Sequence, residues 1–299
     1  MEENKHRVSV IIPNYDRKEH IGRLLQSIAS QKFHDYEVII IDDCSPDRSA
    51  ILPNIGGFIK DHKNMRLIEN KENIGFVRTC NKGIRLAKAE YICILTNDTL
   101  VTSDFLAENV KIMDNDKSIG ILSCIIVDPQ GKNWFSGGMF KKGVHINLRD
   151  DFQGIRPVDF VAGTAAFYRR EVFDRVGLLD ESFHMYHEDV EFCLRVRKGT
   201  DYKVCMFADK LVTHYTGLLK TLAYTKFLYY SHRNHMLILK KYFPKYIPMV
   251  LLHYIREIID LLFISISKLQ PSYNRFAVPI VMGTISGLLH RKGRNYDLH

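Results

Sequence analysis

Several common sequence signatures are missing from this chain of 299 residues. No two of its six cysteines have the Cys-x-x-Cys spacing of a zinc ribbon, and no HExxH motif of a zinc protease is present. GxGxxG does not follow the first predicted strand and GxxxxGK[ST] occurs nowhere, which disfavours a Rossmann dinucleotide site and a P-loop. The most apolar segment, residues 247–267, contains charged residues, so no transmembrane helix is predicted.

Acidic residues are scarce in the C-terminal part of the chain. Residues 218–299 contain 12 Lys and Arg but only 3 Asp and Glu. The first 217 residues contain 30 Lys and Arg and 31 Asp and Glu. The net charge of +8 therefore belongs to this C-terminal segment, which also holds 12 of the 33 aromatic residues. We expect an anionic partner to bind the tail and not the N-terminal body.

The N-terminal residues and the cysteines predict the cellular compartment. Residues 1–7 are polar and lead directly into a predicted strand, so no signal peptide is expected. Cys93 and Cys124 lie in apolar runs and are predicted to be small buried side chains. A reduced, cytoplasmic location is the simplest interpretation.

Apolar and amphipathic segments alternate through the first 127 residues. Strands are predicted over residues 8–12, ending at Pro13, and over residues 37–41, 65–69, 91–95 and 119–127. Helices are predicted from apolar spacing over residues 21–28, over residues 73–88, and after a cap at Ser103 or Asp104. This alternation predicts an α/β fold with a mostly parallel sheet flanked by helices.

The pattern is less regular after residue 127. A strand over residues 158–168 with an interruption at Gly163, a helix over 188–198 and short strands over 202–207 and 210–214 are predicted. From residue 218 the chain is predicted to be helical, and residues 247–267 form an amphipathic helix with His253, Arg256, Glu257 and Asp260 on one face. We therefore expect two domains, residues 1–217 and residues 218–299.

Three aspartates follow predicted strands. Asp42, Asp43 and Asp98 lie at carboxyl ends, where open α/β sheets bind their ligands. Asp98 could hold a hard divalent cation, or else cap a helix or turn. Asp42 and Asp43 could accept hydrogen bonds from a base or ribose, or else form a local turn with the residues that follow.

Two further candidates lie later in the chain. Glu188 and Asp189 begin a predicted helix, where acidic side chains favour the helix dipole or where one carboxylate acts as a general base. His214 ends a predicted strand, where it could be structural or could complete a mixed nitrogen and oxygen metal site with Asp98.

Six sequence stretches occur in a specific order. They are VSVIIPNYDR, EVIIIDDCSPD, ENKENIGFVRTCNKGIRLAKAEYICILTNDT, VDFVAGTAAFYRREVF, HEDVEFCLRVR and THYTG. Through these stretches, residues 7–217 resemble the family 2 glycosyltransferases, nucleotide-sugar enzymes of the GT-A fold. The stretch YYSHRN at residues 229–234 is similar to one in the rhamnosyltransferase-like branch of that family.

The resemblance implies a role for each matching residue. Residues expected to bind the nucleotide sugar are Pro13, Asn14, Tyr15, Asp42, Asp43, Arg78, Asn81, Asn97, Gly163 and Thr164, the last two on the acceptor side. Asp98 and His214 are expected to hold Mg²⁺ or Mn²⁺. Thr96 stands where the DXD motif of the family has its first acidic residue. Asp189 is expected to be the general base, with Glu188 beside it.

These assignments predict a metal-dependent, inverting hexosyltransferase in surface glycan synthesis. The donor would be a nucleoside-diphosphate sugar, such as dTDP-rhamnose or a UDP-sugar, and the acceptor a saccharide or lipid-linked molecule. The alternatives are an inactive transferase-like scaffold and a sugar-nucleotide nucleotidyltransferase, although the latter lacks a glycine-rich loop near the first strand.

The basic, aromatic tail is expected to bind an anionic membrane surface peripherally, on the inner face of the cell membrane. Packing on the body or an oligomer interface is the alternative interpretation. Nucleic acid is not an expected partner, because no nucleic-acid-binding motif accompanies the charge.

Overall fold

The computed structural model describes residues 6–16, 18–215, 221–267 and 274–291. The chain divides into two compact units. The first comprises Met1–Met139, Asn147–Leu179 and Phe192–Thr216, and the second comprises Phe140–Ile146, Asp180–Glu191 and Gly217–His299. The domain boundary predicted at residue 217 lies outside the described residues.

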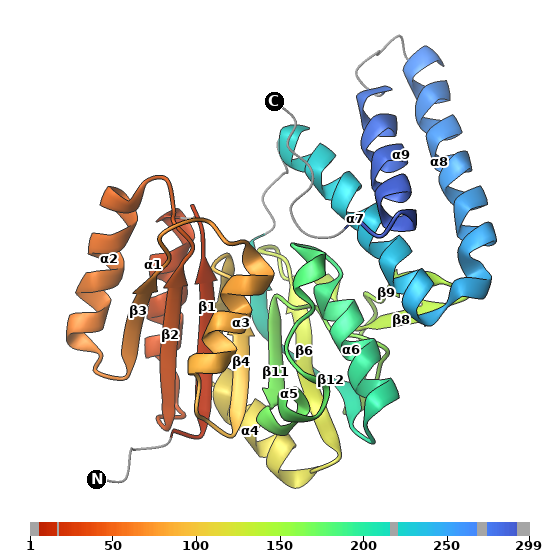
Figure 1. Ribbon diagram of the computed structural model, residues 1–299. Coiled ribbons are helices and arrows are strands. Elements are labelled where there is room, and N and C mark those ends of the chain that lie inside the picture. The colour runs from red at the N-terminus through yellow and green to blue at the C-terminus, as the bar shows by residue number, and fades with distance from the viewer. Residues whose placement is uncertain (1–5, 17, 216–220, 268–273, 292–299) are drawn as a thin grey trace. The chain divides into compact units, whose positions relative to one another are not determined.

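The first unit contains one mixed β-sheet (Figure 1). The strands are β1 (Val8–Asn14), β2 (Tyr36–Asp42), β3 (Met65–Glu69), β4 (Tyr91–Leu95), β5 (Thr99–Val101), β6 (Ile119–Val127), β7 (Asn133–Phe135), β10 (Ile155–Pro157), β11 (Ala165–Arg169) and β12 (Lys203–His214). Their order is β10-β12-β6-β11-β4-β1-β2-β3, with β5 paired to β12 and β7 to β6. A separate hairpin is formed by β8 (Gly138–Lys141) and β9 (Val144–Asn147).

Most of the central strands run parallel. β3, β2, β1 and β4 are parallel neighbours, as are β6 and β12, whereas β11 lies antiparallel between β4 and β6. Asn14 pairs with Asp42 and Asp42 pairs with Glu69, so three strands end at one edge of the sheet. The predicted α/β fold with a largely parallel sheet is confirmed.

Helices flank the sheet. They are α1 (Lys18–Ala29), α2 (Arg48–Asp61), α3 (Phe76–Leu86), α4 (Phe105–Asn115), α5 (Arg170–Val176) and α6 (Glu188–Gly199), whose first four residues belong to the second unit. β1 and β6 are buried along their whole length, as expected for strands covered on both faces. This burial explains their largely apolar sequences.

β1 extends beyond its predicted end. Pro13 was expected to end the strand, but β1 continues to Asn14. The ladder with β4 stops at the Ile11–Ile94 pair, so beyond it β1 pairs with β2 alone. Pro13 has no N–H to donate, but it is tolerated because β4 does not pair with β1 at this position.

Other differences from the predicted elements have local causes. α2 was not predicted, because Pro53 and the Gly56-Gly57 pair lower its helix propensity. The predicted strand over residues 158–168 is strand only from Ala165, and the two short strands predicted after residue 201 form the single strand β12. An irregularity in pairing between Phe207 and Val212 separates the two halves of β12.

The second unit is built around three helices, α7 (Thr221–Tyr242), α8 (Ile247–Ser267) and α9 (Asn274–Leu288). The bounds predicted for the amphipathic helix at residues 247–267 are those of α8. None of the helices in the described part of the chain is both long and apolar enough to span a bilayer.

α7 and α9 pack closely because of two glycines. A Cβ atom at Gly283 would lie 2.3 Å from the carbonyl oxygen of Tyr229, and one at Gly287 would lie 2.5 Å from that of Arg233. The Tyr229 hydroxyl also hydrogen bonds to Ser286 Oγ at 3.0 Å. Any larger residue at the two glycines would push the helices apart, so this contact fixes α7 in the second unit.

Candidate active site

Three residues predicted to bind the nucleotide form one buried hydrogen-bonded chain. Asn14 Nδ2 donates to Asp42 Oδ1 at 3.0 Å, and Asn97 Nδ2 donates to Asn14 Oδ1 at 2.8 Å. Ser45 donates its hydroxyl to Asp42 Oδ1 at 2.6 Å and its N–H to Asp42 Oδ2 at 3.1 Å. The fold therefore brings the three residues together at the carboxyl edge of the sheet, and the local turn considered for Asp42 is also present.

Asp43 holds the loop that precedes α3. Its Oδ1 accepts from Asn70 Nδ2 at 2.8 Å and from the N–H of Ile74 at 2.9 Å, and its Oδ2 accepts from the N–H of Gly75 at 2.8 Å. Gly75 has a φ of 88°, a conformation that favours glycine. The carboxylate thus sets the path of the loop, while its contact with a ribose stays a prediction.

The other predicted nucleotide residues have varied surroundings. Pro13 is buried in β1, Tyr15 is 47% exposed and Arg78 is exposed on α3. Asn81 is buried, and its amide donates to the carbonyl of Leu179 at 2.9 Å and accepts from the N–H of Leu179 at 3.0 Å. These contacts give Asn81 a structural role, and its place in a nucleotide pocket stays a prediction.

The predicted acceptor-side residues lie beside the stretch that stands in for the DXD motif. Gly163 and Thr164 precede β11, and the carbonyl of Thr164 accepts from the N–H of Thr96 at 3.0 Å. This backbone bond places the loop next to the residues that follow β4.

Asp98 and His214 meet at the end of the sheet. His214 Nε2 lies 3.4 Å from Asp98 Oδ1, and the two side chains are 11% and 15% exposed. The Thr96 hydroxyl donates to the same Asp98 oxygen at 2.8 Å. The Trp134 ring packs edge-on against the His214 ring, with 4.5 Å between the ring centroids. Both predicted metal ligands are therefore adjacent, and Thr96 orients the carboxylate.

This pair fits a divalent cation. Two neighbouring ligand atoms on an octahedral ion with bonds of about 2.1 Å lie about 3 Å apart, close to the observed separation. His214 Nδ1 is buried and lacks a hydrogen-bond partner, so the ring is held by its Nε2 contact with Asp98 and by packing against Trp134. Within the described ranges, no group of three or more His, Cys, Asp or Glu side chains that could hold a metal ion is present.

Glu188 and Asp189 belong to the second unit and begin α6. Asp189 is half-buried, and its Oδ1 accepts from the N–H of Val190 at 2.8 Å. Glu188 is 7% exposed, its Oε2 has no hydrogen-bond partner, and burial together with the Asp189 carboxylate raises the pKa of Glu188. The two carboxyl groups therefore differ, since Glu188 favours the neutral form and Asp189 has better access to solvent.

Sequence reasoning missed residues that support the site. Ser45 orients Asp42 through the local turn considered from the sequence, whereas Asn70, 27 residues from Asp43, is identified only by its contact in the structure. Asn234 contacts the turn before α6 and lies in the YYSHRN stretch. That stretch was a sequence signal, but nothing in it indicated which segment its side chains would contact.

Comparison with known proteins identifies the family. A model described as glycosyl transferase family 2 matches residues 9–177. The chain belongs to this family. The match includes the strand-end residues of the first unit and ends before Glu188.

This family 2 glycosyltransferase has relatives along most of its length. It is 23% identical over 299 residues to the low-salt glycan biosynthesis hexosyltransferase Agl10 of Haloferax volcanii, covering 96% of this chain and 92% of that protein. It is 24% identical over 214 residues to the amylovoran biosynthesis glycosyltransferase AmsB of Erwinia amylovora, covering 69% of each.

Solved structures share the GT-A fold. The mannosyltransferase PcManGT from Pyrobaculum calidifontis, in complex with GDP-Man and Mn²⁺, has a TM-score of 0.60 and 17% identity, covering 96% of this chain and 88% of that one. S. aureus TarS 1-349, in complex with UDP-GlcNAc, has a TM-score of 0.60 and 19% identity, covering 78% of this chain and 66% of that one. The chain spans only 39% of a longer TarS chain.

Proposed function

We propose that this family 2 glycosyltransferase is a metal-dependent, inverting hexosyltransferase that acts in surface glycan synthesis. The observation that carries the proposal is the adjacent Asp98–His214 pair at the edge of the sheet, 3.4 Å apart and largely buried. The names of its relatives, which refer to low-salt glycan and amylovoran biosynthesis, support the choice of product.

The residues divide the chemistry between them. Asp98 and His214 would hold Mg²⁺ or Mn²⁺, which when bound would stabilise the negative charge of the departing diphosphate. Thr96 keeps the Asp98 carboxylate oriented through its 2.8 Å hydrogen bond. Asp189 removes the proton from the attacking acceptor hydroxyl, and direct displacement at the anomeric carbon inverts its configuration.

The donor is a nucleoside-diphosphate sugar, with dTDP-rhamnose and UDP-sugars as the first candidates. The complexes of the structural neighbours with GDP-Man and with UDP-GlcNAc support this donor class and extend the candidates to GDP-sugars. The acceptor is a saccharide or a lipid-linked saccharide. An inactive scaffold would need no adjacent pair of metal ligands, and a nucleotidyltransferase would need a triphosphate-binding loop.

A donor panel tests this function directly. With Mn²⁺ present, the correct donor is expected to raise the melting temperature of the full chain by about 4 °C at a hundredfold excess over its Kd. The same donor should be hydrolysed slowly or transferred to a saccharide acceptor. Nucleoside triphosphates plus sugar phosphates serve as the control for a nucleotidyltransferase. Binding of no nucleoside-diphosphate sugar would contradict the proposal.

We further propose that the second unit binds an anionic membrane surface through α8 and α9, which lie side by side (Figure 1). α9 and the following residue expose only apolar side chains along one face, namely Val278, Val281, Met282, Ile285 and Leu289, each at least 40% exposed. α8 exposes a second apolar row, namely Leu252, Ile255, Ile259, Leu262 and Phe263. Apolar faces of this kind insert into the boundary between headgroups and acyl chains.

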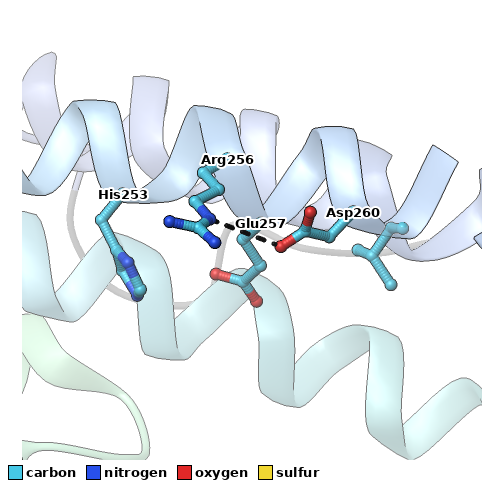
Figure 2. A pocket seen from close by; sticks show the side chains of 5 residues that line it. His253, Arg256, Glu257 and Asp260 are labelled. Carbon is cyan, nitrogen blue, oxygen red and sulfur yellow. Dashed lines mark ion pairs between the residues drawn. The ribbon is translucent and has the colours of Figure 1, made fainter. Parts of the chain in front are cut away.

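The charge of the segment favours a bilayer over a second protein copy. Residues 218–299 have an excess of nine positive charges, which would attract anionic lipids and repel a second copy. The polar side of α8 carries the Arg256–Asp260 ion pair, and both residues line a pocket of about 320 Å³ (Figure 2). Tyr229 and Tyr230 are buried, so the aromatic residues of α7 contribute less to this surface than the sequence predicted.

Vesicle flotation tests the membrane proposal. The full chain is expected to float with vesicles that contain phosphatidylglycerol, and the double variant Phe263→Glu/Ile285→Glu should lose this binding at least about 10-fold. His253→Glu, on the polar side of α8, is the matched control. Unchanged flotation of the double variant would overturn the assignment. A dimer that the double variant disrupts, in the absence of flotation, would assign the faces to self-association.

A further inference from the structure

The turn before α6 has an unusual backbone. His184, Tyr186 and His187 have φ values of 30°, 64° and 63°, in the left-handed region that residues other than glycine rarely adopt. Such a conformation is unfavourable for these residues and persists only where the surrounding structure holds it. Because Glu188 and Asp189 follow immediately, whatever holds this turn also places the two carboxyl groups.

α7 holds the turn through two buried side chains. Asn234 Nδ2 donates to the carbonyl of Met185 at 2.7 Å and to that of Tyr186 at 2.6 Å. Arg233 Nη2 donates to the carbonyl of Ser182 at 3.1 Å, and Arg233 Nε donates to Asn234 Oδ1 at 2.8 Å. Both side chains are fully buried. The amide of Asn234 therefore uses both of its hydrogens on the turn, while Arg233 fixes its orientation.

α7 also holds the first turn of α6, through Glu191. Two helical turns beyond Arg233 and Asn234, Lys241 Nζ and the Tyr242 hydroxyl each lie 2.7 Å from Glu191 Oε1. Glu191 is fully buried, so these donors stabilise a carboxylate that would otherwise be costly to bury. The segment from Ser182 to Glu191 is thus attached to one helix at both ends, with Asp189 between the attachments.

We infer that α7 is the element that positions the catalytic base, with Asn234 and Lys241 as its positioning residues. This inference rests on the proposed role of Asp189. The inference also assigns a role to the YYSHRN stretch, because the last two residues of that stretch are Arg233 and Asn234. α7, a helix of the C-terminal segment, would then contribute to the rate of sugar transfer, while α8 and α9 bind the protein to the membrane.

Neighbouring lysines on α7 provide a matched pair of variants. Lys241 contacts Glu191, whereas Lys240 Nζ donates to the carbonyl of Leu288 on α9 at 2.6 Å. Lys241→Met is expected to lower kcat about 10-fold with the donor Kd unchanged, and Lys240→Met should keep kcat. Asn234→Ala, which removes two bonds to the turn, is expected to lower kcat about 100-fold. Lys241→Arg should restore most of the activity.

A double-mutant cycle separates positioning from general stability. In an Asp189→Asn background, Asn234→Ala and Lys241→Met should lower kcat by less than about 2-fold, because no base remains to be placed. Losses of the same size with and without Asp189 would overturn the inference. If Asp189→Asn itself leaves kcat unchanged, the proposed function fails instead. If Asn234→Ala does not fold, as judged by circular dichroism, the Lys241 pair decides the question.

Discussion

Asp189→Asn is expected to lower kcat for sugar transfer by about 10³-fold, within the range for loss of a general base. Asparagine has the same size and keeps an oxygen that can accept from the N–H of Val190, as Asp189 Oδ1 does at 2.8 Å. The start of α6 should therefore remain in place while the proton acceptor is lost. Donor affinity, measured by calorimetry with Mn²⁺, is expected to change less than about 2-fold.

Asp174→Asn is the matched control, because it makes the same chemical change at an exposed carboxylate on α5. It should leave kcat and donor affinity unchanged. Loss of donor binding in Asp189→Asn would assign this residue to the donor and not to proton transfer. An unchanged kcat would remove it from the chemistry altogether.

Asp98→Ala is expected to weaken metal-dependent donor binding about 100-fold. His214 would remain as the only protein ligand of the adjacent pair, and the Thr96 hydroxyl would lose the carboxylate oxygen to which it donates. The effect is measured by calorimetric titration of the protein with the nucleoside diphosphate, once in the presence of Mn²⁺ and once in the presence of EDTA. The difference between the two titrations should be large in the wild-type protein and nearly absent in the variant.

Asp104→Ala is the control for this second experiment, because Asp104 follows Asp98 in the sequence but pairs with Lys32 on the surface. Its titrations should match those of the wild-type protein. Wild-type titrations that are identical with Mn²⁺ and with EDTA would contradict a metal role for Asp98 and His214.

The strands of the first unit were predictable because their sequences are unusually rich in apolar, β-branched residues. Apart from Ser9 and Glu37, the runs VSVII and EVIII consist of apolar, β-branched residues, which is typical of strands buried on both faces. α2 was not predictable in the same way, since Pro53 and two glycines disfavour a helix locally. β11 shows a further limit, because a sequence does not indicate that one strand will enter a parallel sheet in the opposite direction.

The candidate site was predictable where it lies at strand ends. Parallel strands place their carboxyl ends at one edge, where Asp42, Asp43 and Asp98 were expected, and Asp42 lies there in hydrogen-bonded contact with Asn14, which is bonded to Asn97. Contacts between distant segments were not predictable. Asn234 lies 48 residues from Tyr186, and Asn81 lies 98 residues from Leu179.

The sequence by itself determined the chemical groups, their order along the chain and the location of the positive charge. These properties belong to single residues and local periodicity, and they were sufficient to indicate the family. Only the tertiary structure decided which side chains are covered. Tyr229 and Tyr230 are buried against the second unit's own segments, while the apolar faces of α8 and α9 remain exposed. Burial depends on what packs against a residue from elsewhere in the chain, and no local pattern specifies that neighbour.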